Sequence, residues 1–143
     1  MFIGEYSHTI DQKGRMAVPA KMRSQLGSGG VITRGIDSCL WIFPKKEWMA
    51  LAEKLSQLPL TDTNSRAFSR LMLAGAMEVE FDSQGRILLP GYLRGYAGLA
   101  KNAIVAGLYS RLEIWDEEKW QSYKEKTEKA TESITKAMSD LGI

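Results

Sequence analysis

The sequence predicts a β-rich α+β fold, in which two similar β-hairpin units pair within one chain and helices lie outside them. The first observation is an internal repeat, because residues 11–19 (DQKGRMAVP) return as residues 82–90 (DSQGRILLP). The second is that the matched positions hold turn residues and apolar residues, whereas the polar positions differ. The third is size: a unit of about 45 residues lies near the lower limit for an independent core, so two units are expected to share one.

Each unit is expected to begin with a β-hairpin. Residues 2–10 alternate in part between apolar and polar side chains, and residues 77–81 alternate strictly, which is typical of half-buried strands. The Asp-x-x-Gly sequence that follows each of them is a turn signal, since Asp can bond its own backbone and Gly accepts a positive φ. Residues 15–18 and 86–89 are then predicted to be the return strands.

Proline and short apolar runs define the rest of each unit. Pro19 and Pro90 end the return strands, because proline cannot donate to a strand ladder, and both suit the first turn of a helix. We therefore expect short helices over residues 20–26 and 91–97. Two further strands follow in each unit, at residues 31–34 and 40–43 in the first and at residues 103–106 and 112–115 in the second.

Longer helices are expected outside the two units. Residues 45–58 carry an apolar stripe at helical spacing, residues 66–74 form a second helical segment, and Asp116 is a candidate N-cap for a third. Residues 122–139 are too polar for a core, so this tail either frays or docks on a neighbouring subunit. These segments divide the chain into a first unit (residues 1–48), a helical connection (49–74), a second unit (75–120) and a C-terminal helical tail (121–143).

Composition argues against several classes of protein. One cysteine and one histidine allow neither an internal disulfide nor a Cys/His zinc site within one chain. We expect no cofactor, no small-molecule substrate, no signal peptide and no membrane segment, and hence a cytoplasmic protein. The sequence holds no nucleophile elbow, P-loop or dinucleotide fingerprint, so we do not expect an enzyme.

The charge of the chain is unevenly distributed. The formal net charge is only +2, but residues 10–35 hold a single acid, Asp11, among five basic side chains. Such a patch is the footprint of a site for a polyanion, although a cluster of solvated side chains is the commoner explanation. The five basic residues are Lys13, Arg15, Lys21, Arg23 and Arg34.

The repeated Asp-x-x-Gly-Arg motif allows two compatible interpretations. In the structural one, the Asp ties down the turn, the Gly takes a positive φ, and the Arg returns to pair with the Asp. In the functional one, Arg15 and Arg86 start a two-stranded ribbon that enters the DNA major groove, where arginine can bridge guanine O6 and N7. Lys13, Lys21, Arg23 and Arg34 would then contact phosphates. The motif residues are Asp11, Gly14 and Arg15 in the first unit and Asp82, Gly85 and Arg86 in the second.

Aromatic residues cluster after the last strand of each unit and could in principle stack on bases. The repeat, however, aligns Phe43 with Trp115 and Trp48 with Trp120. This correspondence favours packing between a strand and the following helix.

The N-terminal sequence resembles the MraZ family of bacterial regulators. The resemblance is carried by residues 1–15 (MFIGEYSHTIDQKGR), 18–21 (VPAK) and 33–35 (TRG), and it extends more loosely over the whole chain. It implies two AbrB-like swapped-hairpin units that form one small barrel as an intrachain pseudo-dimer. It also implies a nucleoid-associated transcriptional regulator that assembles into a homo-oligomeric ring. That regulator would bind direct repeats in double-stranded DNA, in the promoter of its own division and cell-wall operon.

In that family the Asp-x-x-x-Arg motifs belong to the DNA-binding face, which here means Asp11 with Arg15 and Asp82 with Arg86. Lys13 and Lys21 have no basic counterpart in the second unit, so we expect the first hairpin to supply most of the affinity. One alternative stays open: a non-catalytic protein-interaction or antitoxin-like oligomeric module that uses the same hairpins to bind protein.

Overall fold

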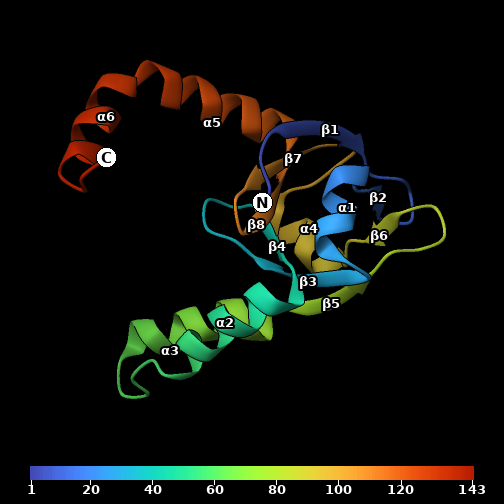
Figure 1. Ribbon diagram of the computed structural model, residues 1–143, viewed down its shortest axis with the longest axis horizontal. Helices are drawn as coiled ribbons and strands as arrows, with labels where there is room; N and C mark the ends of the chain where they lie inside the picture. Colours follow the sequence, from blue (N-terminus) through green and yellow to red (C-terminus); the bar gives the residue numbers. More distant parts are fainter.

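The computed structural model describes residues 1–143 as a mixed α+β domain with two antiparallel sheets (Figure 1). One sheet has six strands in the order β1-β7-β8-β4-β3-β5, and the other pairs β2 with β6. The strands of the first unit are β1 (Glu5–Thr9), β2 (Arg15–Ala17), β3 (Gly29–Arg34) and β4 (Leu40–Phe43). Those of the second are β5 (Met77–Glu80), β6 (Arg86–Leu88), β7 (Asn102–Leu108) and β8 (Arg111–Asp116).

The two units interlock by exchanging strands. β1 pairs with β7 of the second unit, and its counterpart β5 pairs with β3 of the first. β4 pairs with β8 in the middle of the large sheet, and β2 pairs with β6 in the small one. The pairing is therefore symmetric: replacing each strand by its counterpart in the other unit gives the same set of strand pairs. The predicted pairs β3–β4 and β7–β8 are confirmed.

The expected closed barrel is not formed. β1 and β5 are the two edges of the six-stranded sheet and do not pair with each other. The hairpins expected at the start of both units are also reduced. β1 and β2 are joined only by the isolated bridge between Ile10 and Met16, and β5 and β6 are not neighbours in either sheet. The strand beyond each turn pairs across the units instead, as β2 does with β6.

One apolar core is shared by the two units, as the repeat predicted. Met16 and Ile87 face each other across β2 and β6 and are both buried. Other buried positions in the same cluster also come as repeat-related pairs, namely Val18 with Leu89, Met22 with Leu93 and Leu26 with Ala97.

The short helices α1 (Ala20–Leu26) and α4 (Gly91–Ala97) begin directly after Pro19 and Pro90, as predicted. The connection between the units forms α2 (Lys45–Ser56), α3 (Thr63–Ser69) and a π-helical turn, η1 (Arg70–Ala74). α3 begins earlier than predicted because Asp62 caps it, accepting a hydrogen bond from the Ser65 amide at 2.7 Å.

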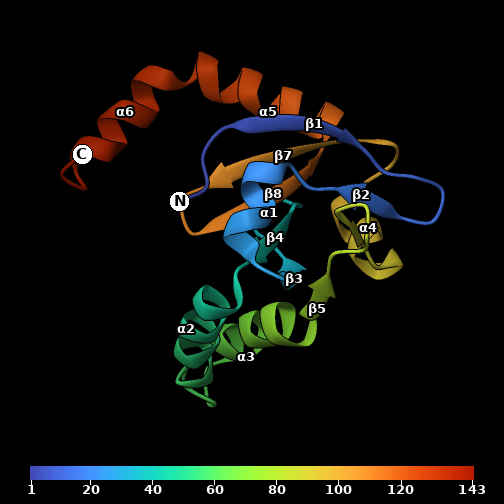
Figure 2. The same cartoon turned by 45° about the vertical axis from the view of Figure 1, so that its right-hand side comes forward.

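The C-terminal tail is helical but broken. Asp116 caps α5 (Glu117–Lys129), as predicted, and α6 (Thr131–Ser139) follows after Ala130. Figures 1 and 2 show α2–α3 and α5–α6 leaving the body as two separate arms. None of the helices has the length and apolar composition that crossing a bilayer requires.

Aromatic pairs attach both arms to the sheet. The ring centroids of Phe43 and Trp48 are 5.8 Å apart, and those of the equivalent Trp115 and Trp120 are 5.3 Å apart. The prediction of strand-to-helix packing is therefore confirmed in both units.

The shared core makes a stability prediction. Met16→Ala or Ile87→Ala should each lower the free energy of unfolding by about 2–5 kcal/mol, because each leaves a cavity in the contact between units. The double variant should lose less than the sum, since the two side chains face each other. Urea unfolding followed by circular dichroism measures this, with Met49→Ala as the control because Met49 is 67% exposed. Two separate unfolding transitions would contradict a single shared core.

Candidate nucleic-acid interface

The first turn is organised around the Asp11 carboxylate. Its Oδ1 accepts hydrogen bonds from the amides of Lys13 and Arg15, both at 2.9 Å. Its Oδ2 accepts a hydrogen bond from Arg15 Nε at 2.8 Å. Gly14 has a φ of +84°, which permits the tight turn. The structural interpretation of the motif is therefore confirmed here.

The second turn repeats this geometry. Asp82 accepts hydrogen bonds from the amides of Gln84 and Arg86 and from Arg86 Nε, all at 2.9 Å. Gly85 has a φ of +74°. In each turn the arginine backbone amide is the main reason that the pKa of the aspartate lies below its ordinary value, so both carboxylates are ionised at neutral pH.

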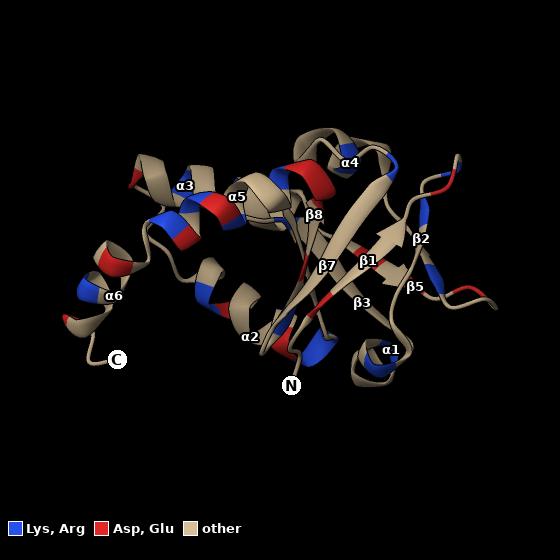
Figure 3. Cartoon of the chain, turned by 90° about the horizontal axis from the view of Figure 1, so that it is seen from above, with Lys and Arg blue, Asp and Glu red and all other residues tan.

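The two arginines lie on the outward face of the β2–β6 ribbon. Met16 and Ile87 point into the core, so strand alternation places Arg15 and Arg86 on the opposite face, beside the exposed Leu88. Figure 3 shows the turns projecting from one end of the molecule, opposite the end that holds α3 and α6.

The two turns differ in one ion pair. Arg86 Nη1 lies 3.7 Å from Asp11 Oδ2, so Asp11 serves both arginines. Asp82 has only its own Arg86 as an ion-pair partner. The Arg15 side chain makes its contact through Nε, and neither of its terminal nitrogens has a partner within the chain.

Each turn is supported by an arginine from the other unit. A Cβ added at Gly14 would lie 2.9 Å from Cζ of Arg94 in α4, and one added at Gly85 would lie 2.6 Å from Nη1 of Arg23 in α1. Arg94 Nε donates to the Leu89 carbonyl at 2.9 Å, and Arg23 Nη1 donates to that of Val18 at 2.8 Å. The turn glycines thus admit both a positive φ and a guanidinium group directly beneath them.

The structure does not bring all the predicted residues together. Lys13 is exposed at the tip of the first turn, whereas Lys21 lines a shallow pocket beside Ile3 and Tyr6. Arg34 lies over the rings of Tyr92 and Tyr96, with its Cζ 5.9 and 5.8 Å from their centroids.

Helical spacing puts those two tyrosines on the face of α4 away from Arg94, so Arg34 does not join the turns. Arg94 does join them, although it is absent from the predicted set. Its repeat correspondence with Arg23 was the signal that could have identified it.

The other reactive side chains form no chemical centre. No group of three His, Cys, Asp or Glu side chains is placed to hold a metal ion. Cys39 is buried, and burial is the main reason that its pKa is raised to about 12, which keeps the thiol protonated at neutral pH.

Comparison with known proteins finds the same two-part organisation. The family model described as "MraZ protein, putative antitoxin-like" matches residues 1–71 and again residues 72–141. The chain is 49% identical over 143 residues to the "Transcriptional regulator MraZ" of Natranaerobius thermophilus and to that of Halothermothrix orenii. It is 50% identical over 143 residues to the protein of the same name from Clostridium beijerinckii. All three comparisons cover 100% of both chains.

The crossed arginines predict effects on the opposite unit. Arg94→Ala should disturb the first turn and Arg23→Ala the second, because each removes the group beneath the other unit's glycine. Amide chemical shifts of Gly14 and Gly85 report this directly, with Arg70→Ala as an exposed control. The interpretation fails if each variant shifts only the glycine of its own unit.

The turn carboxylates predict an acid response. Asp11 and Asp82 should titrate below the ordinary aspartate pKa of about 3.9. Because the folded-state pKa is lowered, their stabilisation is fully present above that ordinary value and is lost as pH falls through the lowered one. Carboxyl NMR titration measures both midpoints, and Asp→Asn variants assign them. Midpoints at or above about 3.9 would be the contrary result.

Proposed function

The chain belongs to the MraZ family and is a transcriptional regulator rather than an enzyme, and we propose that it acts by binding double-stranded DNA sequence-specifically. Its target in this proposal is a set of direct repeats in the promoter of its own division and cell-wall operon. The choice of operon and repeats rests on the family resemblance, and the mode of binding rests on the ribbon.

The observation that supports the proposal is that the Arg15 guanidinium is fixed at one nitrogen and free at the other two. Asp11 holds its Nε and leaves its two terminal nitrogens free on the outward face of a two-stranded ribbon. Such a ribbon fits the major groove, and a fixed arginine fork matches guanine O6 and N7. Because Arg86 also interacts with Asp11, its fork is less free, so the first turn makes the main base contact.

Phosphate contacts come from lysines in this proposal. Lys13 and Lys21 are exposed and have no ion-pair partner in the chain, so binding a phosphate would break no internal salt bridge of either lysine. The phosphate role expected for Arg23 and Arg34 stays a prediction. We propose that they also support the second turn and α4, because their guanidinium groups lie against Gly85 and against two tyrosines.

Assembly of several copies would raise the affinity for DNA, because a single copy has only one basic patch. In our proposal residues 1–48 and 75–120 bind DNA, and the helical segments 49–74 and 121–143 connect copies into a homo-oligomeric ring in the nucleoid. One basic patch gives non-specific affinity of only about 10⁻⁴–10⁻⁶ M. Several linked patches on spaced repeats raise the overall affinity without any new contact.

A second candidate follows from the antitoxin-like wording of the family description. In that function the same ribbon would bind a partner protein instead of DNA. Salt dependence separates the two, since release of counterions gives DNA binding a steep dependence on salt.

The assignment to the first turn predicts three different phenotypes. Arg15→Ala should weaken binding by about 1–3 kcal/mol per protomer and reduce sequence discrimination. Lys21→Ala should weaken all sequences alike and reduce the salt slope by about one unit, because the protein then neutralises one phosphate fewer. Arg86→Ala should act mainly by releasing Asp82 in its turn, and so lower the melting temperature.

The experiment measures DNA binding over a salt series, and thermal melting, on the three variants side by side. The DNA is the region upstream of the protein's own gene, with a scrambled duplex as control. Normal binding by Arg15→Ala, together with abolished binding by a stable Arg86→Ala, would refute the assignment. Equal affinity of the unaltered protein for both duplexes would refute sequence-specific binding.

A further inference from the structure

Helix α4, which carries Arg94, is intrinsically weak. It has seven residues (GYLRGYA), two of them glycines, and so short a helix is not stable by itself in water. Its repeat counterpart α1 (AKMRSQL) has the same length but no glycine. Ser24 and Gln25 of α1 also donate hydrogen bonds to the Lys21 carbonyl of the same helix, at 2.8 and 3.3 Å. α4 therefore depends more than α1 on contacts with other segments.

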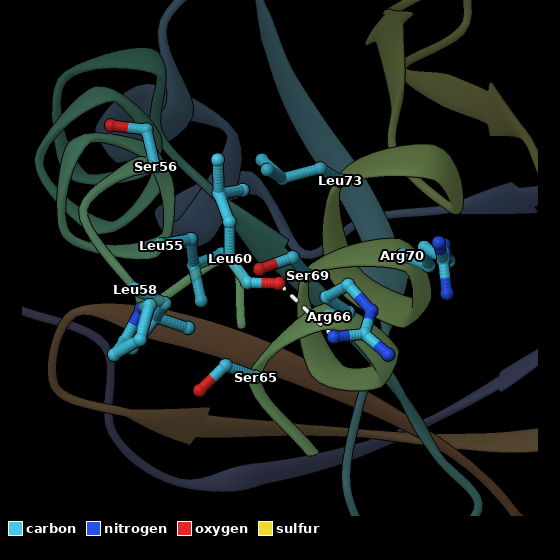
Figure 4. A pocket seen from close by; sticks show the side chains of 10 residues that line it. Leu55, Ser56, Leu58, Leu60, Ser65, Arg66, Ser69, Arg70 and Leu73 are labelled. Carbon is cyan, nitrogen blue, oxygen red and sulfur yellow. Dashed lines mark hydrogen bonds between the residues drawn. The ribbon is translucent and has the colours of Figure 1, made fainter. Parts of the chain in front are cut away.

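Two tyrosines of α4 supply some of these contacts. Tyr96 Oη donates to the Gly35 carbonyl at 2.6 Å, and Tyr92 Oη donates to the Gly75 carbonyl, directly after η1, at 2.9 Å. Figure 4 shows Leu73 of η1 directed towards leucines of α2 and of the following loop, so Tyr92 connects α4 to the α2–α3 arm. Both contacts are made by side chains, and they leave the last backbone carbonyls of α4 to other partners.

A lysine of α5 holds the carboxyl end of α4. Lys119 Nζ donates to the Ala97 carbonyl at 3.2 Å, and a Cβ added at Gly98 would lie 2.5 Å from the same nitrogen. The last carbonyls of a helix have no partner inside it and form the negative end of its dipole, so an ammonium group is a favourable partner. Gly98, which has a φ of +62° and ends α4, leaves the space that Lys119 occupies.

The closing turn of α4 includes Arg94 itself. The Leu99 amide donates to the Arg94 carbonyl at 2.9 Å, a bond typical of helices that end at a glycine. On the other side, Arg94 Nε donates to the Leu89 carbonyl, and the Leu89 amide donates to the Gly14 carbonyl, both at 2.9 Å. A continuous set of contacts therefore joins α5 to the first turn through α4.

The second turn has no equivalent contact with α2. Glu47 of α2 is the repeat counterpart of Lys119, since each lies one position before an aligned tryptophan. A carboxylate cannot donate to a carbonyl, and the negative end of a helix repels it. A Cβ added at Gly27, at the end of α1, would accordingly meet no atom of another segment within 4 Å. α1, which carries Arg23 beneath the second turn, is therefore not held in this way.

We propose that Lys119 is a positioning residue for the first turn. Its ammonium group keeps the closing turn of α4 intact, α4 keeps Arg94 beneath Gly14, and the turn at Gly14 directs Arg15. The first turn thereby depends on how α5 sits on the body, whereas the second turn does not. The consequence for DNA rests on the proposed function, but the structural part is tested without DNA.

Lys119→Met tests the contact, because it keeps a long side chain and removes the ammonium group. The amide signal of Gly14 and the Nε–H signal of Arg15 should shift in NMR spectra, and the corresponding signals of the second turn should not. Lys119→Arg keeps a charged donor and should leave all these signals near their original positions. Lys46→Met is the matched control, because Lys46 is an exposed lysine of α2 that takes part in none of the five ion pairs.

The route through Arg94 has its own test. In the Arg94→Ala background, Lys119→Met should displace the Gly14 signal no further, because the group through which Lys119 acts is already absent. A general loss of stability would instead move the signals of Gly14 and Gly85 alike.

DNA binding gives the functional readout. Lys119→Met should weaken binding to the upstream duplex by about 2–10-fold, the equivalent of one net hydrogen bond. The salt slope should stay unchanged, because no phosphate contact is lost. Lys46→Met should bind like the unaltered chain, which separates the effect from the loss of one positive charge.

Four results would overturn the proposal. They are an unmoved Gly14 signal in Lys119→Met, equal displacement of Gly14 and Gly85, equal displacement of Gly14 by Lys119→Met and Lys119→Arg, and further displacement in the Arg94→Ala background. A salt slope reduced by about one unit would also contradict it, because Lys119 would then be a phosphate contact. Failure of the proposed function looks different: the unaltered chain does not prefer the upstream duplex, while the displacement of Gly14 remains.

Discussion

The pairing of strands across the two units is the constraint on which the rest of the structure depends. β1 is bonded to β7, β5 to β3 and β2 to β6, so neither unit has a complete sheet alone. Met16 and Ile87 then meet in one shared core, whereas a unit of about 45 residues lies near the lower limit for a core of its own. Each strand that would close a local hairpin is instead committed to the other unit. The six-stranded sheet is open, since its edge strands β1 and β5 do not pair with each other.

The same exchange positions the turns. A guanidinium from each unit lies beneath the turn glycine of the other, as Arg94 does at Gly14 and Arg23 at Gly85. The arrangement is nearly symmetric, and its one departure is that Asp11 interacts with the arginines of both turns. That small difference gives the two turns different freedom, although their backbone geometry is the same.

The body separates two surfaces with different chemistry. The turn face presents fixed arginines and an exposed lysine side chain at one end of the molecule, and the helical arms leave it at the other end (Figure 3). Aromatic packing of Phe43 on Trp48 and of Trp115 on Trp120 anchors these arms to the strands of the sheet. Contacts between copies through the arms therefore leave the turn face uncovered, and a partner at the turns leaves the arms uncovered.

The sequence by itself determined the features that depend on near neighbours. The repeat, the two Asp-x-x-Gly-Arg turns, the helices after Pro19 and Pro90 and the shared core all follow from residues a few positions apart or from the repeat itself. The repeated motif was enough to identify the turn residues of the candidate site, and the N-terminal sequence of residues 1–15 indicated the family. Their geometry is local, because each turn closes through bonds between an aspartate and residues two to four positions away.

Only the tertiary structure decided which strands pair and where the outlying basic side chains lie. β1 and β2 could have formed a continuous hairpin on sequence grounds, but each is bonded to the other unit. Arg34 belongs to the basic cluster in sequence, yet β3 places it between two tyrosines of α4. Arg94 lies outside that cluster, yet α4 places it beneath Gly14. The physical reason is that these positions depend on contacts between residues far apart in the chain. The spacing of residues in the sequence does not show which distant strand will form backbone hydrogen bonds with a given strand.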